Sequence, residues 1–94
     1  MIQSFADGDT ERLFRGQAPR RLPSDIWRRG ARKLLLIHAV ADVWELRVPP
    51  GNRLELLKGG RAGQYSIRIN DQWRVCFEWR DGNAHAVEIV DYHG

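Results

Sequence analysis

The sequence contains few residues of the kinds that crosslink small proteins or bind metals in them. Its 94 residues include one cysteine, Cys76, and three histidines. A single cysteine excludes an internal disulfide framework and fits a reducing compartment such as the cytoplasm. The histidines lie at 38, 85 and 93, and with the cysteine they show no metal-ligand spacing. We therefore expect no metal and no cofactor.

Long apolar runs are also missing. The longest, LLLIHAVA at 34–41, is interrupted by His38 and is far shorter than the ~20 residues that span a bilayer. The opening MIQSFADGD has no basic segment followed by an apolar one, so no secretory signal is expected. These features predict a cytoplasmic protein with no membrane partner.

The composition is that of a folded domain. Hydrophobic residues make up 43% and charged residues 29% of the chain, which is typical of globular proteins. A chain of this length supports one core, and no linker or repeat divides it. We expect residues 1–94 to form a single domain.

Basic residues are concentrated in the segment 12–33, although the net charge is only +3. That segment holds eight basic residues and one acid, Asp25. Such a segment attracts polyanions, with nucleic acid the first candidate, while a solvated helix face explains it equally well. The candidate RNA-binding residues in it are Arg20, Arg21, Arg28, Arg29, Arg32 and Lys33.

The N-terminal half reads as a strand followed by two helices. Residues 1–5 predict a short strand, and residues 9–16 a short helix that Asp9 or Thr10 caps and Gly16 ends. Prolines at 19 and 23 predict a loop. Ser24 then predicts the start of a longer helix, which we expect to end near Leu46, before the prolines at 49 and 50.

The longer helix is predicted to be amphipathic. At 100° per residue its apolar stripe comprises Ile26, Gly30, Leu34, Ile37, Ala41 and Trp44. Leu36 is expected on the opposite side, among Arg28, Arg29 and Arg32. An apolar residue there weakly indicates a surface for a protein partner.

From residue 53 the apolar period changes to two. The segments 53–57, 64–70, 73–79 and 84–90 predict four strands joined by short turns. Trp73, Val75 and Phe77 alternate with Arg74 and Cys76, so one face is apolar and the other polar. The fold class is therefore α+β, with helices packed on one face of an antiparallel meander.

The polar face of this meander is a candidate RNA-cleaving site. Neighbouring strands lie ~4.8 Å apart, so Arg68 and Arg74 can converge on one phosphate, with Lys58 and Arg61 in the glycine-rich turn nearby. The final strand leads into three groups that exchange protons: Asp91, Tyr92 and His93. RNA carries its own nucleophile, the 2′-hydroxyl, so such groups suffice without a metal. Solvated strand ends and a wet sheet face are the alternative explanation.

Three segments of the sequence are distinctive together: IQSF, RLELLKGGRAGQYSIRINDQWRVCFEWRDG and VEIVDYHG. In combination they resemble the HigB-type killer toxins of the RelE/ParE superfamily. The resemblance implies two helices on an antiparallel sheet, and ribosome-dependent mRNA cleavage without a metal. It implies two partners, the ribosome with mRNA in its decoding site and a cognate helix-turn-helix antitoxin of the HigA type. Matching family positions tied to the active site are Lys58, Arg74, Asp91, Tyr92 and His93.

Glu55 departs from part of this family. Some relatives have LHPLKG where this chain has LELLKG, and other relatives share the glutamate. A carboxylate is a competent general base, but when ionised it donates no proton. Glu55 is therefore expected to be a base or an orienting group, which leaves the acid role to His93 or Tyr92.

Two rival functions remain at this stage. A ParE-like protein would poison DNA gyrase by binding it and would not be expected to need the terminal Asp-Tyr-His triplet. A non-catalytic module would dock RNA or protein through its basic face. The triplet at 91–93 favours the nuclease.

Overall fold

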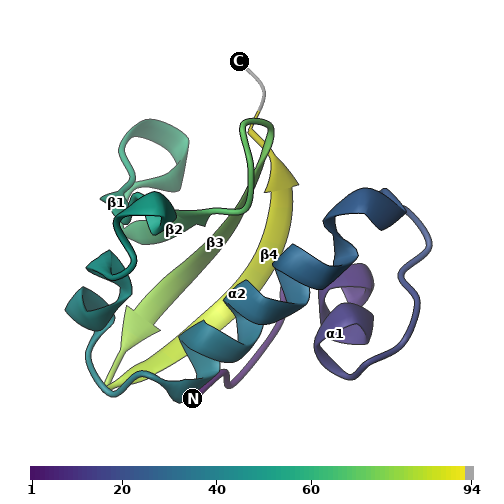
Figure 1. Ribbon diagram of the computed structural model, residues 1–94. Helices are drawn as coiled ribbons and strands as arrows, with labels where there is room; N and C mark the ends of the chain where they lie inside the picture. Colours follow the sequence, from purple (N-terminus) through teal and green to yellow (C-terminus); the bar gives the residue numbers. More distant parts are fainter. Residues whose placement is uncertain (93–94) are drawn as a thin grey trace.

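A four-stranded antiparallel sheet organises the fold in the computed structural model, which describes residues 1–92. Its strands are β1 (Glu55–Leu56), β2 (Gln64–Arg68), β3 (Trp73–Arg80) and β4 (Asn83–Asp91), and they follow one another in sequence order. Figure 1 shows the helices on one face of this sheet. The predicted α+β class and meander are confirmed.

The period-two pattern separates the two faces of the sheet. Val75 and Phe77 on β3 are fully buried beneath the helices, together with Ile67 of β2 and Val87 of β4. Successive side chains of a strand point to opposite faces, so Arg74 and Cys76, which alternate with Val75 and Phe77, belong to the face without helices. In the register between β2 and β3, Ser66 pairs with Cys76.

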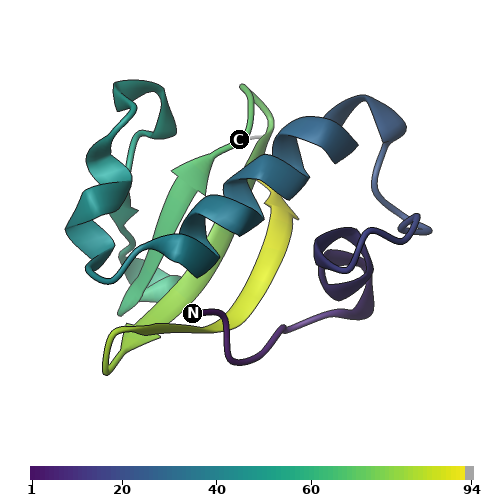
Figure 2. The ribbon, with the colours of Figure 1, turned by 60° about the horizontal axis from the view of Figure 1, so that its bottom comes forward.

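Two helices cover the apolar face. The short α1 (Gly8–Phe14) is capped by Asp7, whose carboxylate accepts from the Thr10 backbone N–H at 3.3 Å. The longer α2 (Trp27–Ala39) crosses the sheet diagonally (Figure 2). A Cβ on Gly30 would lie only 3.1 Å from a Leu13 side-chain carbon, so glycine lets α2 approach α1 closely.

The N-terminal segment pairs with β4 more loosely than a strand does. Ile2 and Phe5 form isolated parallel bridges with Ala84 and Val87. Between those bridges β4 bulges at Ala86, which has a φ of +52°, and the register with β3 shifts at the same place. The bulge interrupts the ladder and explains why the predicted strand at 1–5 is reduced to two bridges.

The prediction of one helix from Ser24 to Leu46 is wrong at both ends. Ser24–Ile26 is a 3₁₀ turn without a side-chain cap, and α2 ends at Ala39. A new 3₁₀ helix, Val43–Arg47, follows because Asp42 caps it and Glu45 completes a capping box. Because the chain changes direction before this new helix, Trp44, which we predicted in the buried stripe, is 50% exposed.

The expected exposure of Leu36 is also wrong. Leu36 packs against the core, whereas its neighbour Leu35 is 57% exposed. The segment after α2 folds back beside the helix (Figure 2), with Val43 and Leu46 buried. The covered part of the helix surface is therefore wider than a single stripe.

Helix length bears on membrane insertion. Within residues 1–92, no helix is both long enough and apolar enough to cross a bilayer.

Candidate active site

An open cavity of about 280 Å³ lies on the polar face of the sheet, at the end where β2 turns into β3. Its walls come from the chain before β1, from β1, from the β2–β3 hairpin and from the end of β4. The lining residues are Arg53, Glu55, Arg68, Asn70, Asp71, Arg74 and Tyr92. The cavity therefore gathers four predicted site residues, three from β1, β2 and β3 and one, Tyr92, from the chain directly after β4.

Arg74 is the most enclosed charge of this cavity, with 8% of the residue exposed. Its Nε donates to the Ser66 hydroxyl at 2.9 Å, and its Nη2 donates to the Arg53 carbonyl at 2.6 Å. Its Nη1 lies 3.1 Å from a carboxylate oxygen of Glu55. These contacts use three of the five N–H donors of a guanidinium, so two remain for a ligand that enters the cavity.

The local backbone explains this arrangement. Arg68 pairs with Arg74 across β2 and β3, which places Ser66 diagonally opposite Arg74 on the same face. The Arg53 carbonyl arrives from a different segment, the 3₁₀ turn Pro50–Asn52, after which Arg53 itself adopts a left-handed conformation with φ 46° and ψ 58°. That unusual residue lines the cavity just before β1 begins.

Tyr92 closes the cavity from the C-terminal end. Arg74 lies over its ring, with the guanidinium carbon 5.5 Å from the ring centroid. The backbone N–H of Tyr92 donates to the Gln72 carbonyl at 2.6 Å, so the end of the described chain lies beside the β2–β3 turn (Figure 1). Tyr92 is 43% exposed and is accessible to a ligand.

Asp91 does not share the cavity with Tyr92. Strand alternation turns its side chain to the other face, where it accepts from the Gln72 side chain at 3.0 Å. Asp91 therefore helps to hold the chain end against the turn. His93 lies outside the described residues.

Glu55 is one of two accessible carboxylates that line the cavity. Its side chain is 52% exposed, although one oxygen is paired with Arg74. A second acid, Asp71, is paired with Arg68 at the opposite wall. Three arginines thus face two carboxylates, which leaves the cavity with an excess of positive charge for an anionic ligand.

Lys58 and Arg61 do not line this cavity. Lys58 is exposed and precedes the 3₁₀ turn Gly59–Arg61. Arg61 forms an ion pair with Glu88 at 2.8 Å and donates to Gln64 at 3.0 Å, farther along the polar face. The hydrogen bond that Arg61 donates to Glu88 raises the pKa of Arg61, while burial raises the pKa of the Cys76 thiol. Farther along the polar face, the charge of Arg61 is thus already paired within the protein, with Glu88.

The basic residues of α2 divide into two groups. Arg28 and Arg32 are exposed and have no contact with the sheet among the hydrogen bonds of the described residues. Arg29, although exposed as well, donates to the Ile69 carbonyl at 3.2 Å, and the half-buried Lys33 donates to the Asn52 side chain. Burial lowers the pKa of Lys33, and the charges of Arg29 and Arg68 lower it further. Arg29 and Lys33 therefore tie α2 to the sheet and to the 50–52 turn.

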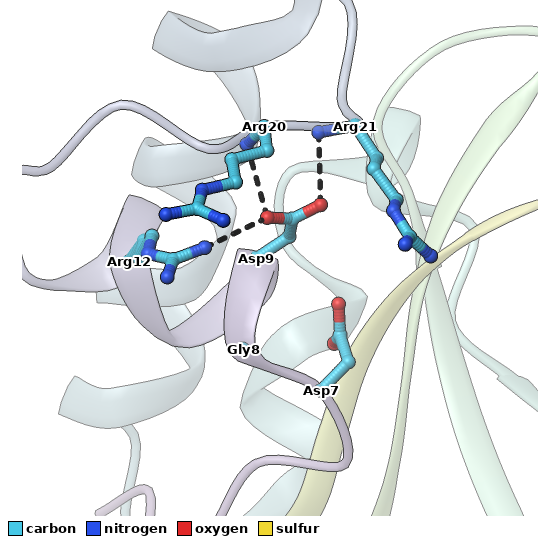
Figure 3. Close-up of a pocket in the computed structure, with 6 residues that line it drawn as sticks. All are labelled: Asp7, Gly8, Asp9, Arg12, Arg20 and Arg21. Carbon is cyan, nitrogen blue, oxygen red and sulfur yellow. Dashed lines mark hydrogen bonds and ion pairs between the residues drawn. The ribbon is translucent and has the colours of Figure 1, made fainter.

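Arg20 and Arg21 belong to a second cavity, of about 270 Å³, beside α1 (Figure 3). Their backbone N–H groups donate to the two carboxylate oxygens of Asp9, at 3.0 and 2.9 Å. The bond from Arg20, supported by that from Arg21, holds the pKa of Asp9 below its usual range. Arg12 adds an ion pair to the same carboxylate at 3.5 Å. Asp9 thus anchors the loop before α2.

Several residues of the first cavity were not expected from the sequence. Ser66 and the Arg53 carbonyl hold Arg74, and Asn70 lines the wall. The turn residues before Arg53, PPGN, were a signal for an unusual backbone there, but nothing in the sequence indicates which side chain the following carbonyl meets. Within residues 1–92, no three metal-binding side chains of His, Cys, Asp or Glu lie together.

Sequence relatives cover almost the whole chain. Toxin HigB-1 of Vibrio cholerae is 41% identical over 85 residues, which are 89% of this chain and 90% of the relative. The Endoribonuclease HigB of Proteus vulgaris is 30% identical over 93 residues, 99% of this chain and 100% of the relative. The positions compared therefore include the walls of the cavity.

A solved structure matches the fold. The crystal structure of YafQ from E. coli strain BL21(DE3) superposes with a TM-score of 0.57, covering 98% of this chain and 94% of YafQ at 13% identity. Residues 3–93 also match the HigB-like toxin family, described as the RelE-like toxin of the type II toxin-antitoxin system HigB. The chain belongs to this family of HigB-like, RelE-like toxins of type II toxin-antitoxin systems.

Proposed function

We propose that this toxin is an endoribonuclease that cuts mRNA on the ribosome, without a metal, in the cavity around Arg74. One observation carries the proposal: a nearly buried arginine lies beside an accessible carboxylate and an accessible tyrosine in a cavity with excess positive charge. The name of the Proteus vulgaris relative, Endoribonuclease HigB, supports the same reaction.

The chemistry follows from the groups in the cavity. Arg74 and Arg68 bind the scissile phosphate, and Arg74 stabilises the charge that develops on it. Glu55 removes the proton of the 2′-hydroxyl, and the 2′-oxygen then forms a bond to phosphorus. The bond from phosphorus to the 5′-oxygen breaks as a proton is delivered to that oxygen. The products are a 2′,3′-cyclic phosphate and a 5′-hydroxyl end.

The remaining site residues have supporting roles in this proposal. His93 or Tyr92 supplies the proton to the leaving oxygen, and Asp91 secures the chain end that carries them. Lys58 and Arg61, one turn away from the cavity, contact flanking phosphates. An exposed lysine reaches a phosphate as a flexible point charge, which suits a contact outside the cavity.

The partners follow from the family and from the charge distribution. Arg28 and Arg32 on α2, with Arg20 and Arg21 before it, offer exposed cations for ribosomal RNA. Such contacts are independent of sequence, so the ribosome presents the codon that is cut. The neutralising partner is a HigA-like helix-turn-helix antitoxin, and the toxin acts in the cytoplasm, where ribosomes translate.

The test is to map mRNA ends after brief induction of the toxin. We expect cuts in phase with codons and loss of growth, and we expect Arg74→Ala to reduce cleavage about 10²–10³-fold. Arg80→Ala is the matched control, because Arg80 lies on the same strand but is exposed at its far end. DNA damage with intact mRNA would instead indicate a gyrase poison, and ribosome binding without cleavage would indicate a binding module.

A further inference from the structure

Arg74 is held from behind by two acceptors that the proposed reaction does not use. The Ser66 hydroxyl accepts from Nε at 2.9 Å, and the Arg53 carbonyl accepts from Nη2 at 2.6 Å. Ser66 has no exposed surface, and Arg74 is 8% exposed. A buried guanidinium requires such partners, because an unpaired charge is costly away from water. Their positions also fix how the guanidinium plane is oriented.

The carbonyl of Arg53 is itself fixed by a braced turn. Asn52 is fully buried, and its amide donates to the carbonyls of Leu46 and Val48, at 3.2 and 3.3 Å. Its side-chain oxygen accepts from Lys33 of α2. The backbone N–H of Arg53 donates to the Pro50 carbonyl at 3.1 Å. The Arg53 carbonyl is therefore connected to α2 through Asn52 and Lys33. It stays in place if the Arg74 side chain moves.

We propose that Ser66 is a positioning residue for Arg74: with the Arg53 carbonyl, its hydroxyl holds the guanidinium in one orientation, with the two remaining N–H donors toward the cavity. This inference rests on the proposed function. Ser66 touches no substrate, since it is fully buried behind Arg74.

The physical effect of losing Ser66 is specific. Without the hydroxyl, the Nε–H of Arg74 loses its partner in a buried place, and the guanidinium tilts toward a position where water or Glu55 satisfies it. Misplacing a phosphate-binding group lowers the rate of the chemical step. Affinity for the ribosome depends instead on exposed basic residues, such as Arg28 and Arg32, which Ser66 does not contact.

The experiment compares Ser66→Ala, Ser66→Thr and the control Cys76→Ala on purified ribosomes with mRNA in the decoding site. Cys76 is directly opposite Ser66 across the strands and equally buried, and alanine removes one γ atom in either case. Single-turnover cleavage at increasing toxin concentration gives a maximal rate and a half-saturating concentration. We expect Ser66→Ala to lower the maximal rate about tenfold or more, with little change in half-saturation.

Two results are expected to distinguish positioning from a general loss of stability. Ser66→Thr, which keeps the hydroxyl, recovers most of the rate, and Cys76→Ala stays near the unmodified toxin. In nuclear magnetic resonance spectra, the Nε–H of Arg74 is protected from exchange with water in the unmodified toxin and in Ser66→Thr, and exchanges rapidly in Ser66→Ala.

The inference and the proposed function fail differently. If the unmodified toxin leaves ribosome-bound mRNA intact, the proposed function is wrong, and the exchange measurement still tests how Ser66 holds Arg74. If the unmodified toxin cleaves mRNA and Ser66→Ala cleaves it at the same maximal rate, the positioning role is overturned. Should Ser66→Thr not fold, the protection of the Arg74 Nε–H in the unmodified toxin and its loss in Ser66→Ala decide the question.

Discussion

The guanidinium carbon of Arg74 lies 5.5 Å from the ring centroid of Tyr92, so an arginine of β3 is in contact with the last residue of the described chain. A cation over an aromatic ring is attracted to the face of that ring. The contact places the tyrosine and the arginine at the same cavity, although Arg74 lies on β3 and Tyr92 follows β4. Substitutions at Tyr92 can therefore separate the role of its ring from the role of its hydroxyl.

The first prediction concerns the ring and the hydroxyl of Tyr92. Tyr92→Phe keeps the ring over Arg74 and is expected to retain most of the cleavage rate, with His93 as the proton donor. Tyr92→Ala removes the ring and is expected to lose about tenfold, the scale of a partly buried cation–π contact. The rate is measured with ribosome-bound mRNA.

A matched control for these variants is Tyr65→Phe. Tyr65 packs against Phe77, 6.1 Å between centroids, on the face of the sheet that carries the helices. Equal inactivation by Tyr92→Phe and Tyr92→Ala would contradict the prediction and assign the proton transfer to the tyrosine hydroxyl.

The second prediction concerns Glu55 as the base. Glu55→Gln keeps the shape of the side chain but cannot take up the proton of the 2′-hydroxyl, so we expect cleavage to fall about 10²–10⁴-fold. Glu78→Gln is the control, because Glu78 lies on the same sheet face and pairs only distantly with Arg80, at 3.8 Å. A Glu55→Gln toxin that cuts at the normal rate would remove Glu55 from the mechanism.

The third prediction concerns the exposed cations of α2. Arg28→Ala combined with Arg32→Ala is expected to weaken ribosome binding and to reduce the dependence of log affinity on log salt by about one per lost phosphate contact. The measurement is ribosome binding at several salt concentrations. The fold should be unaffected, because both residues are exposed. An unchanged salt dependence would place ribosome contact elsewhere on the surface.

The fourth prediction concerns acid stability through Asp9. Hydrogen bonds from the backbone of Arg20 and Arg21 lower the pKa of Asp9 in the folded state, below the 3.8 of an unperturbed aspartate. A lowered pKa means that the stabilisation is present above pH ~4 and is lost as the pH falls through the folded-state pKa. Asp9→Asn should therefore unfold at a lower temperature than the unmodified protein at pH 7.

The difference between Asp9→Asn and the unmodified protein should shrink at acid pH, since the aspartate is then protonated as well. Thermal unfolding between pH 2 and pH 7 checks this, with Asp25→Asn, an exposed carboxylate before α2, as the control. A difference that is the same at every pH would show that the charge of Asp9 does not contribute.

The sheet was predictable because its signal is local. Val75 and Phe77 alternate with Arg74 and Cys76, and the strand period of two turns that alternation directly into two faces. The convergence of Arg68 and Arg74 also followed, since short turns leave little freedom in the register of a meander. These parts of the candidate site depend on neighbouring residues and on simple geometry.

The remaining parts depend on contacts between distant segments. The end of α2 at Ala39 reflects competition from the Asp42 and Glu45 capping box, which starts a new helix before the predicted apolar stripe is complete. Asp91 and Tyr92 point to opposite faces because β4 continues to Asp91, where it still pairs with Trp73 of β3. The sequence alone does not show how far this strand extends. The contact between Arg74 and the Arg53 carbonyl joins residues 21 positions apart, and no pattern in the sequence encodes it.

The hydrogen bond from Tyr92 to Gln72 has a practical consequence for handling this protein. A purification tag or fluorescent fusion joined close behind Tyr92 would add bulk near the mouth of the cavity and, on the proposed function, would hinder binding to the ribosome. The first residue lies at the opposite end of the sheet (Figure 1), where its amino group donates to Asn83 at 3.0 Å. Fusions are therefore better placed there, behind a spacer long enough to leave that contact undisturbed.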